Sequence, residues 1–399
     1  MIKEESKILQ DQILARLDLS KQLDDEEIRE LIDREIKLES KKRHLEISAR
    51  ESMRREIFQA VRQMGILQEL IEDPSITEIM VNGIQGIFVE REGKLSRISQ
   101  CFDSLEKLKT VIWQITSGCN RVVNEASPIV DARLPNGARV NVVLDPVAVN
   151  GPILTIRRFP EKPITVEGLI SMRSLSSECR DFLEGLVKAG YNILVSGGTG
   201  SGKTTFLNVL SQFIPDTERV ITIEDSAELQ IKSIPNLVRL ETRNANVEGC
   251  REITIRDLIR TSLRMRPDRI IVGEVRGKET VDMLQSINVG HSAMTTVHAN
   301  SVRDVVSRLE TMVLMGMEIP LSAIHRQIVS GFDLMIHLGR LQDGSRRVLE
   351  IAEPLELSQG EIKMNTIYRL EMGGKEPTLK KVGRLIHEEK YKAAGIRSN

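Results

Sequence analysis

The chain has 399 residues, 40% of them hydrophobic and 28% charged, so it is long enough for two or three folded domains and too apolar to be disordered. Lys and Arg number 56 and Asp and Glu 57, which gives a formal net charge of −1. This balance excludes the strongly basic surface of a general nucleic-acid-binding protein, and we expect no nucleic-acid partner.

Cysteine spacing and apolar runs bear on the cellular compartment. The four cysteines, Cys101, Cys119, Cys179 and Cys250, are far apart and form no C-x-x-C pair. This predicts reduced thiols in a cytosolic protein and no structural zinc site. The first residues are charged, and no run of about eighteen apolar residues occurs, so we expect a protein that is neither exported nor membrane-spanning.

Residues 1–62 predict a helical segment. The first 60 residues contain no Pro or Gly, and Ile28, Ile32 and Ile36 recur at helical spacing behind the capping candidates Asp24 and Asp25. Two interpretations stay open. The segment is either a small bundle or partner-binding appendage, or a solvated helical arm.

Residues 63–158 predict a compact α+β domain. Strands are expected at 76–81, 87–90, 138–144 and 153–158, with helices at 67–71 and 105–116. Arginines at strand ends are usually surface residues, but several gather here, which favours an anion-facing role for at least one of them. The candidates are Arg133, Arg139, Arg157 and Arg158.

Prolines at 160 and 163 predict a linker over 159–176. Strands then alternate with helices through residues 177–357, which predicts a mainly parallel sheet flanked by helices, with ligand chemistry at the carboxyl ends of the strands. Residues 358–399 form a basic, weakly patterned C-terminal tail to which we assign no chemistry.

A glycine-rich loop follows the apolar run Ile193–Val195 and precedes a helical stretch, as a P-loop requires. Main-chain N–H groups and the start of the helix bind phosphate, Lys203 neutralises its charge, and the Thr204 hydroxyl ligates Mg²⁺. The alternative, an ordinary glycine-rich turn, does not explain the flanking strand and helix. The loop residues are Gly197, Gly198, Thr199, Gly200, Ser201, Gly202, Lys203, Thr204 and Thr205.

Acids end two later strands, at Glu224 and Glu274. Near a P-loop such a carboxylate orients the attacking water or holds Mg²⁺ through its water shell; the alternative is that each acid caps the next helix. Two histidines, His291 and His298, flank a further strand. Each is either a core residue or a functional group: His298 would sense the γ-phosphate or water, and His291 would link the sheet to a neighbour.

Four motifs in order resemble a known family: G-G-T-G-S-G-K-T, I-T-I-E-D-S-A-E-L, R-M-R-P-D-R-I-I-V-G-E-V-R-G and G-H-S-A-M-T-T-V-H-A-N-S. They are similar to the Walker A, Asp box, Walker B and His box of the type II/type IV secretion-system ATPases. The upstream D-A-R-L-P-N-G-A-R-V-N and the absence of paired C-x-x-C motifs favour the CpaF-type branch of Tad/Flp pilus assembly. The similarity runs from about Met64 to Pro354.

The resemblance implies an α/β chain with a RecA-like P-loop ATPase domain behind a smaller α+β domain, assembled as a cytoplasmic homohexamer. It implies ATP and Mg²⁺ as cofactors and a polytopic inner-membrane platform protein as partner, so the ring would associate peripherally with the cytoplasmic face of the membrane. By motif position, Lys203, Glu224, Glu274 and His298 are catalytic, Thr204 and Glu274 serve the metal, and His291 belongs to the His box. The arginines named above are implied at the nucleotide, with Arg243, Arg264 and Arg266 as weaker candidates.

One departure concerns the Walker B strand, which ends in Gly273-Glu274 rather than Asp-Glu. Mg²⁺ coordination would then depend largely on Thr204 and water.

Three other functions compete with pilus assembly. They are an ATPase of another type IV secretion machine, a regulatory module switched by nucleotide, and a DNA-translocating motor. The two acids argue against a pure binding module, because binding alone needs no group that positions water. The neutral charge and the 3% aromatic content argue against the DNA motor, which needs cations and stacking surfaces.

Overall fold

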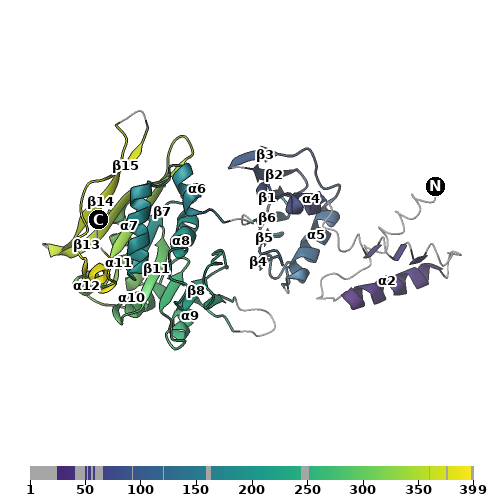
Figure 1. Cartoon of the computed structure of the whole chain (residues 1–399). Coiled ribbons are helices and arrows are strands. Elements are labelled where there is room, and N and C mark those ends of the chain that lie inside the picture. Colours follow the sequence, from purple (N-terminus) through teal and green to yellow (C-terminus); the bar gives the residue numbers. More distant parts are fainter. Residues whose placement is uncertain are drawn as a thin grey trace. The chain divides into compact units, whose positions relative to one another are not determined.

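The computed structural model describes residues 25–40, 50–51, 53–54, 57–58, 66–91, 93–119, 121–158, 163–243, 251–358, 360–373 and 376–396. The chain forms two compact units, Met1–Glu161 and Lys162–Asn399 (Figure 1). Outside the described residues lie residues 1–24 and 41–49 of the expected helical segment, which include the cap candidate Asp24, residues 159–162 of the expected linker, Cys250 and the last three residues of the tail. None of the described helices is long and apolar enough to cross a membrane.

The helical segment near the start of the chain contains α2 (Asp25–Ser40). Its Ile32 and Ile36 are buried, as the helical spacing of these residues predicts. Arg54 pairs with Asp33 at 3.0 Å, so residue 54 lies beside the helix. Because α2 buries an apolar stripe, it is not a fully solvated arm.

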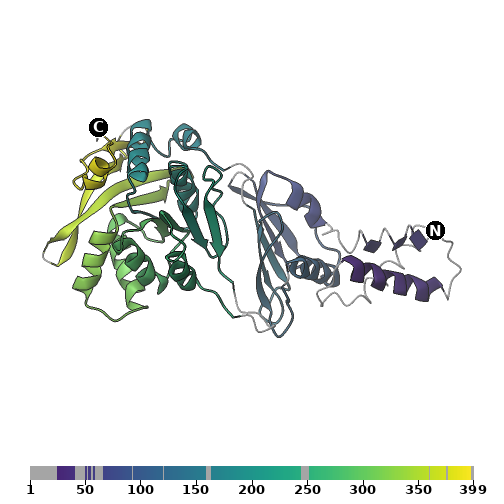
Figure 2. The same ribbon diagram turned by 60° about the horizontal axis from the view of Figure 1, so that its bottom comes forward.

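The first unit contains an antiparallel sheet in which six of the described strands follow the order β3-β2-β1-β6-β5-β4. The strands are β1 (Ile76–Asn82), β2 (Gly86–Arg91), β3 (Lys94–Arg97), β4 (Ile129–Arg133), β5 (Arg139–Val143) and β6 (Ile153–Arg157). Two helices, α4 (Ile66–Glu72) and α5 (Leu105–Gly118), lie on one face (Figures 1 and 2). Alternate strand residues such as Val140 and Ile156 pack against these helices, so the intervening residues point to the other face.

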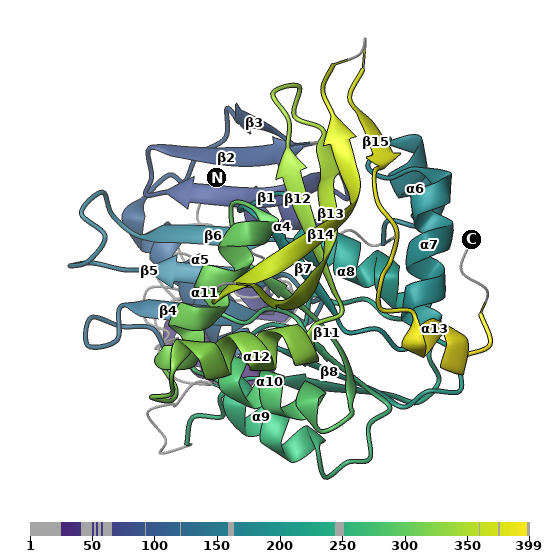
Figure 3. The same cartoon turned by 90° about the vertical axis from the view of Figure 1, so that its left-hand side faces the viewer.

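The second unit contains a larger sheet, in which the described residues give nine strands in the order β15-β14-β13-β12-β7-β11-β10-β8-β9. The neighbouring strands β12, β7, β11, β10, β8 and β9 are parallel to one another, and β13, β14 and β15 continue the sheet antiparallel (Figure 3). The strands are β7 (Ile193–Gly197), β8 (Val220–Glu224), β9 (Leu237–Glu241), β10 (Arg269–Val272), β11 (Ser292–Val297), β12 (Leu334–Arg340), β13 (Arg346–Ser358), β14 (Glu361–Glu371) and β15 (Thr378–Lys381).

Helices cover both faces of this sheet, which explains why the central strands are almost continuously apolar (Figure 3). One core lies under α6 (Val166–Ser171), α7 (Ser177–Lys188) and α8 (Lys203–Ser211). The other lies under α9 (Ile255–Ser262), α10 (Glu279–Asn288), α11 (Val302–Leu314) and α12 (Leu321–Gly331). The predicted α/β class with a mainly parallel sheet is confirmed.

The expected linker differs from the structure in its second half. Residues 166–171 form α6, and Val166 and Leu169 are buried in the core of the second unit. This helix is too short for its two apolar residues to show a helical period. The neighbouring prolines therefore led to the prediction of a linker.

The expected tail also differs, because it folds as part of the second unit. Beyond β14 and β15, α13 (Glu389–Ala393) places Tyr391 in the core, where its hydroxyl donates to the carbonyl of Phe182 at 3.0 Å. The fully buried Glu353 accepts hydrogen bonds from the N–H groups of Ile386 and His387 at 2.7 and 3.2 Å. One buried carboxylate and one tyrosine therefore hold a segment that hydrophobic period alone does not reveal.

Candidate active site

The predicted chemical groups gather where the parallel strands end. Within the sheet, β7, β11, β10 and β8 are successive neighbours. The P-loop follows β7, His298 follows β11, Glu274 follows β10, and Glu224 ends β8. Parallel strands end at the same edge, so the order of the strands sets these groups side by side.

The P-loop has the shape of an anion-binding cradle. Gly200 and Gly202 adopt φ of 71° and 94°, a left-handed region that favours glycine. Gly202 caps α8 without any side-chain hydrogen bond, whereas the side chains of Ser176, Thr254 and Ser301 cap α7, α9 and α11. The first N–H groups of α8 are therefore left for a ligand, and the helix dipole favours an anionic one.

Lys203 connects the cradle to the catalytic candidates. Its side chain is buried, and its ammonium group donates to the carbonyl oxygens of Gly197 and Gly198 at 3.2 Å each. The same nitrogen lies 3.3 Å from the ring nitrogens of His298, whose Nε2 is 3.0 Å from Oε1 of Glu274. Burial lowers the pKa of His298, which favours the neutral ring, and a neutral ring can accept a hydrogen bond from Lys203.

Glu224 is the most deeply buried acid of the site, at 3% exposure. Its Oε1 accepts from the N–H groups of Glu228 and Leu229 at 2.9 Å each, while the buried Oε2 has no hydrogen-bond partner among the described residues. Burial raises the pKa of Glu224 to about 7. An acid with one free oxygen and a pKa near neutrality is suited to accept a proton from water.

This raised pKa predicts how stability depends on pH. The folded protein binds the proton of Glu224 more tightly than the unfolded chain, so this group lowers the free energy of unfolding as pH rises from about 4.5 to 7. Glu224→Gln keeps an acceptor for both N–H groups and removes the charge. We expect the variant to be about 1–3 kcal/mol more stable than the parent at pH 8, with a smaller difference at pH 5.

Denaturant unfolding of nucleotide-free protein at both pH values measures this effect. Glu241 gives a matched control, because it is exposed and lies opposite Glu224 on the neighbouring β9. Glu241→Gln should leave the pH dependence unchanged. Equal stability differences at pH 5 and pH 8 for Glu224→Gln would show that its carboxyl group has an ordinary pKa.

A further arginine contacts the acids, and sequence reasoning missed it. Arg276 donates to Oε2 of Glu274 at 2.9 Å and lies 3.6 Å from Oδ2 of Asp225. A single arginine two residues after a strand-ending acid matches no recognised motif for a functional residue. Its position in the sequence, close to Glu274, was the signal that could have indicated a role.

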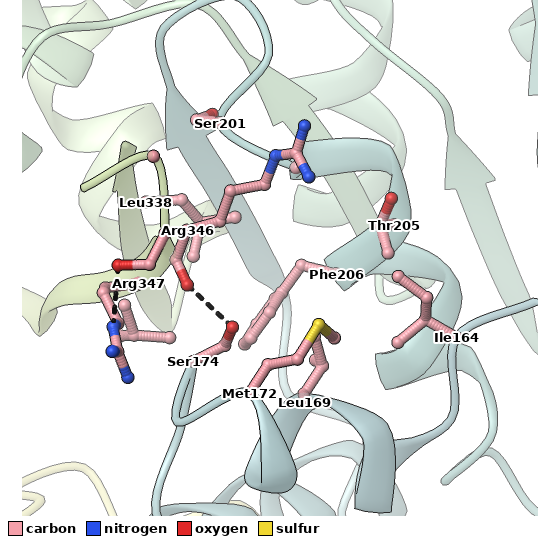
Figure 4. A pocket seen from close by; sticks show the side chains of 14 residues that line it. Ile164, Leu169, Met172, Ser174, Ser201, Thr205, Phe206, Leu338, Arg346 and Arg347 are labelled. Carbon is pink, nitrogen blue, oxygen red and sulfur yellow. Dashed lines mark hydrogen bonds between the residues drawn. The ribbon is translucent and has the colours of Figure 1, made fainter. Parts of the chain in front are cut away.

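A pocket of about 320 Å³ adjoins the P-loop (Figure 4). Phe206, Leu169 and Met172 give it an apolar wall, and Arg346 lies at the loop side, where Nε donates to the carbonyl of Gly200 at 2.9 Å. Arg346 was also missed, because it lies 146 positions from Gly200. The dipeptide Asp343-Gly344 is a hairpin signal that would have predicted the turn before it.

Three of the four predicted arginines of the first unit lie in one row. Arg133 pairs in register with Arg139, which pairs with Arg157, on the face of the sheet away from its helices. Arg158 does not belong to this row, since the next residue of a strand points to the other face. Its guanidinium donates to the carbonyl of Asp73.

The remaining candidates lie apart from the cluster around Lys203. His291 precedes β11, whereas His298 follows it, so the two histidines lie at opposite edges of the sheet. Arg243 donates to the carbonyl of Arg251 at 3.2 Å, and the side chains of Arg264 and Arg266 are exposed.

The described residues fit a magnesium nucleoside triphosphate. The uncapped start of α8 and the lysine in the cradle suit phosphate, and Thr204 lies in the first turn of the same helix. Glu274 supplies a carboxylate at the facing strand end, where oxygen ligands suit Mg²⁺. The arrangement can therefore bind a triphosphate next to two acids.

Comparison with known proteins agrees with this arrangement. A family model for type II/IV secretion system proteins matches residues 60–363. A putative conjugal transfer protein of Mycobacterium tuberculosis is 34% identical over 316 residues, which cover 77% of this chain and 89% of the relative. The type IV secretion system protein PtlH of Bordetella pertussis is 32% identical over 304 residues, which cover 69% and 89%.

Solved structures show the same fold. The pilus retraction motor PilT with bound ADP matches at a TM-score of 0.55 and 21% identity, covering 74% of this chain and 84% of that one. The ATPase DotB of Legionella pneumophila matches at a TM-score of 0.51 and 23% identity, covering 73% and 80%. The RecA-like fold implied by the motifs is thus confirmed, and the chain belongs to the type II/IV secretion system protein family.

Proposed function

We propose that this protein hydrolyses ATP to drive a secretion or pilus-assembly machine. The observation that carries the proposal is the contact chain from Lys203 through His298 to Glu274, which begins in an uncapped phosphate cradle. A phosphate-binding turn without hydrolytic function needs no acid connected to its lysine through a histidine. Phosphoryl transfer requires positioning and charge neutralisation, and this cluster supplies both.

The residues divide the reaction among them. The N–H groups that open α8 and the ammonium group of Lys203 hold the β- and γ-phosphates. Thr204 and Glu274 would hold Mg²⁺ and its water, and the ion would supply neutralisation of charge on the phosphate oxygens. Oε2 of Glu224 accepts a proton as water attacks the γ-phosphorus, and the bond from that phosphorus to the β–γ bridging oxygen breaks to release ADP and phosphate.

The apolar pocket beside the P-loop suits the base of the nucleotide. Its position next to Thr205 and Phe206, immediately after the phosphate-binding residues, is the place from which a base can extend while its phosphates occupy the loop. The row formed by Arg133, Arg139 and Arg157 supplies further positive charge for phosphate. Arginine suits this work because its planar fork binds two oxygens at once.

Within the family we favour the CpaF-type ATPase of Tad/Flp pilus assembly, on the motifs quoted above. We place it as a homohexamer at the cytoplasmic face of the membrane, with a polytopic platform protein as partner. The alternative is the ATPase of another type IV machine, and the similarity to PtlH supports this alternative. A nucleotide-switched regulatory module is disfavoured by the two acids.

Assembly into a ring gives a separate prediction. With ATP and Mg²⁺ bound, we expect the protein to elute at a mass six times that of the chain, measured by light scattering during gel filtration. The reason is the family resemblance, which implies a hexameric ring in which arginines act at the nucleotide sites. A monomer with full ATPase activity would contradict a ring in which arginines act between subunits.

A further inference from the structure

Arg276 joins two acids that follow neighbouring strands. Glu274 follows β10 and Asp225 follows β8, and these strands pair directly. The guanidinium donates to Glu274 through Nη2 at 2.9 Å and approaches Asp225 through Nη1 at 3.6 Å. A planar fork with separate nitrogens can serve both carboxylates, which a lysine ammonium, as a point charge, does less well.

The backbone of Arg276 is itself fixed. Its N–H group and that of Gly277 donate to Oε1 of Glu279 at 2.6 and 2.8 Å, at the start of α10. The side chain therefore extends from an anchored point. The carboxylate of Glu274 is thereby linked through Arg276 to the start of α10.

The other groups around Glu274 have different tasks. The ring of His298 lies 3.0 Å from Oε1 of Glu274 but makes no hydrogen bond to it among the described residues. Lys203 is the phosphate-binding residue of the loop, and a bound triphosphate draws its charge away from Glu274. Arg276 is then the cation that stays hydrogen-bonded to Glu274.

We propose that Arg276 is a positioning residue for hydrolysis, which holds Glu274 against His298 and fixes its separation from Asp225. The inference depends on the ATPase activity proposed above. An exposed ion pair contributes little to stability, and the side chain of Arg276 is 59% exposed. Its effect therefore falls on the geometry of the carboxylate and not on the fold.

Steady-state hydrolysis of ATP by Arg276→Gln and Arg276→Lys tests the inference. We expect Arg276→Gln to lower kcat by about 10–100-fold while KM changes by less than about threefold, since a carboxylate displaced by about 1 Å costs that much in rate. Arg276→Lys should recover only part of kcat, because it keeps the charge and loses the fork. A parent-like kcat for Arg276→Gln overturns the inference.

Arg260 gives a matched control. Its side chain is 54% exposed and pairs with Asp282 at 2.7 Å, in a contact between α9 and α10. Arg260→Gln should leave kcat and KM at the parent values. A fall in kcat equal to that of Arg276→Gln would show that loss of any such ion pair is enough, and would overturn the inference.

Thermal unfolding without nucleotide provides a readout that does not use activity. Because this ion pair is exposed, Arg276→Gln should leave Tm close to the parent value, so that a lower kcat reflects the site and not the fold. A fall in Tm large enough to unfold the variant at the assay temperature would overturn the inference. If the parent itself does not hydrolyse ATP, the proposed function fails and the inference falls with it; if only the variant matches the parent, the proposed function stands.

Discussion

Replacing Lys203 by alanine is expected to lower the affinity for ATP by about two orders of magnitude, which corresponds to about 2–4 kcal/mol for lost charge-assisted hydrogen bonds. Lys203 is 8% exposed in the loop, where little water screens its attraction for phosphate. Burial lowers the pKa of Lys203, so without an anion the loop disfavours the charged form of this side chain. The variant should therefore fold normally.

Titration of a fluorescent ATP analogue with magnesium measures the affinity. Lys188→Ala serves as control, because Lys188 is on the surface of α7 and pairs with Glu184 at 2.6 Å. The control should bind as the parent does. Parent-like affinity in Lys203→Ala, with an unchanged Tm, would refute the phosphate-binding role of the loop.

Glu274→Gln is expected to bind ATP with parent-like affinity and to hydrolyse it about 10²–10⁴-fold more slowly. Glutamine has nearly the same shape, but it lacks the charge that pairs with Arg276 and that lies 3.0 Å from the ring of His298. Glu224→Gln should show the same separation of binding from hydrolysis. The parent rate should also rise as pH increases through about 7, as the carboxyl group of Glu224 loses its proton.

Single-turnover hydrolysis, with binding measured on the same samples, separates the two steps. Glu241→Gln, an exposed acid at the end of β9, should leave both unchanged. Hydrolysis at the parent rate in Glu274→Gln would remove this residue from the reaction. The same outcome for Glu224→Gln would leave water activation to another group.

The sequence was most informative where local chemistry dictates structure. The P-loop needs glycine at positions with left-handed backbone, and the strands before Glu224 and Glu274 are apolar because helices cover both faces of the sheet. Each of these features depends on residues that are adjacent in the sequence. Hence the P-loop, the strand ends and the alternation of strands and helices could be predicted from the sequence.

What could not be predicted depends on contacts between distant residues. Glu353 became a buried acceptor for the segment near Ile386, and Arg346 reached Gly200 across the sheet. The separation of the two histidines, by contrast, could be predicted from the sequence. Seven extended residues span roughly 23 Å at about 3.3 Å per residue, so strand geometry alone already separates His291 from His298.

The neighbouring order of β7, β11, β10 and β8 also has an evolutionary consequence. Adjacent strands are about 4.8 Å apart, so the P-loop and the end of β8 are separated by three such steps, roughly 14 Å. No insertion or deletion in a connecting loop can change this interval, because backbone hydrogen bonding determines it. Surface loops can therefore diversify to suit new assemblies while the reacting groups keep their spacing.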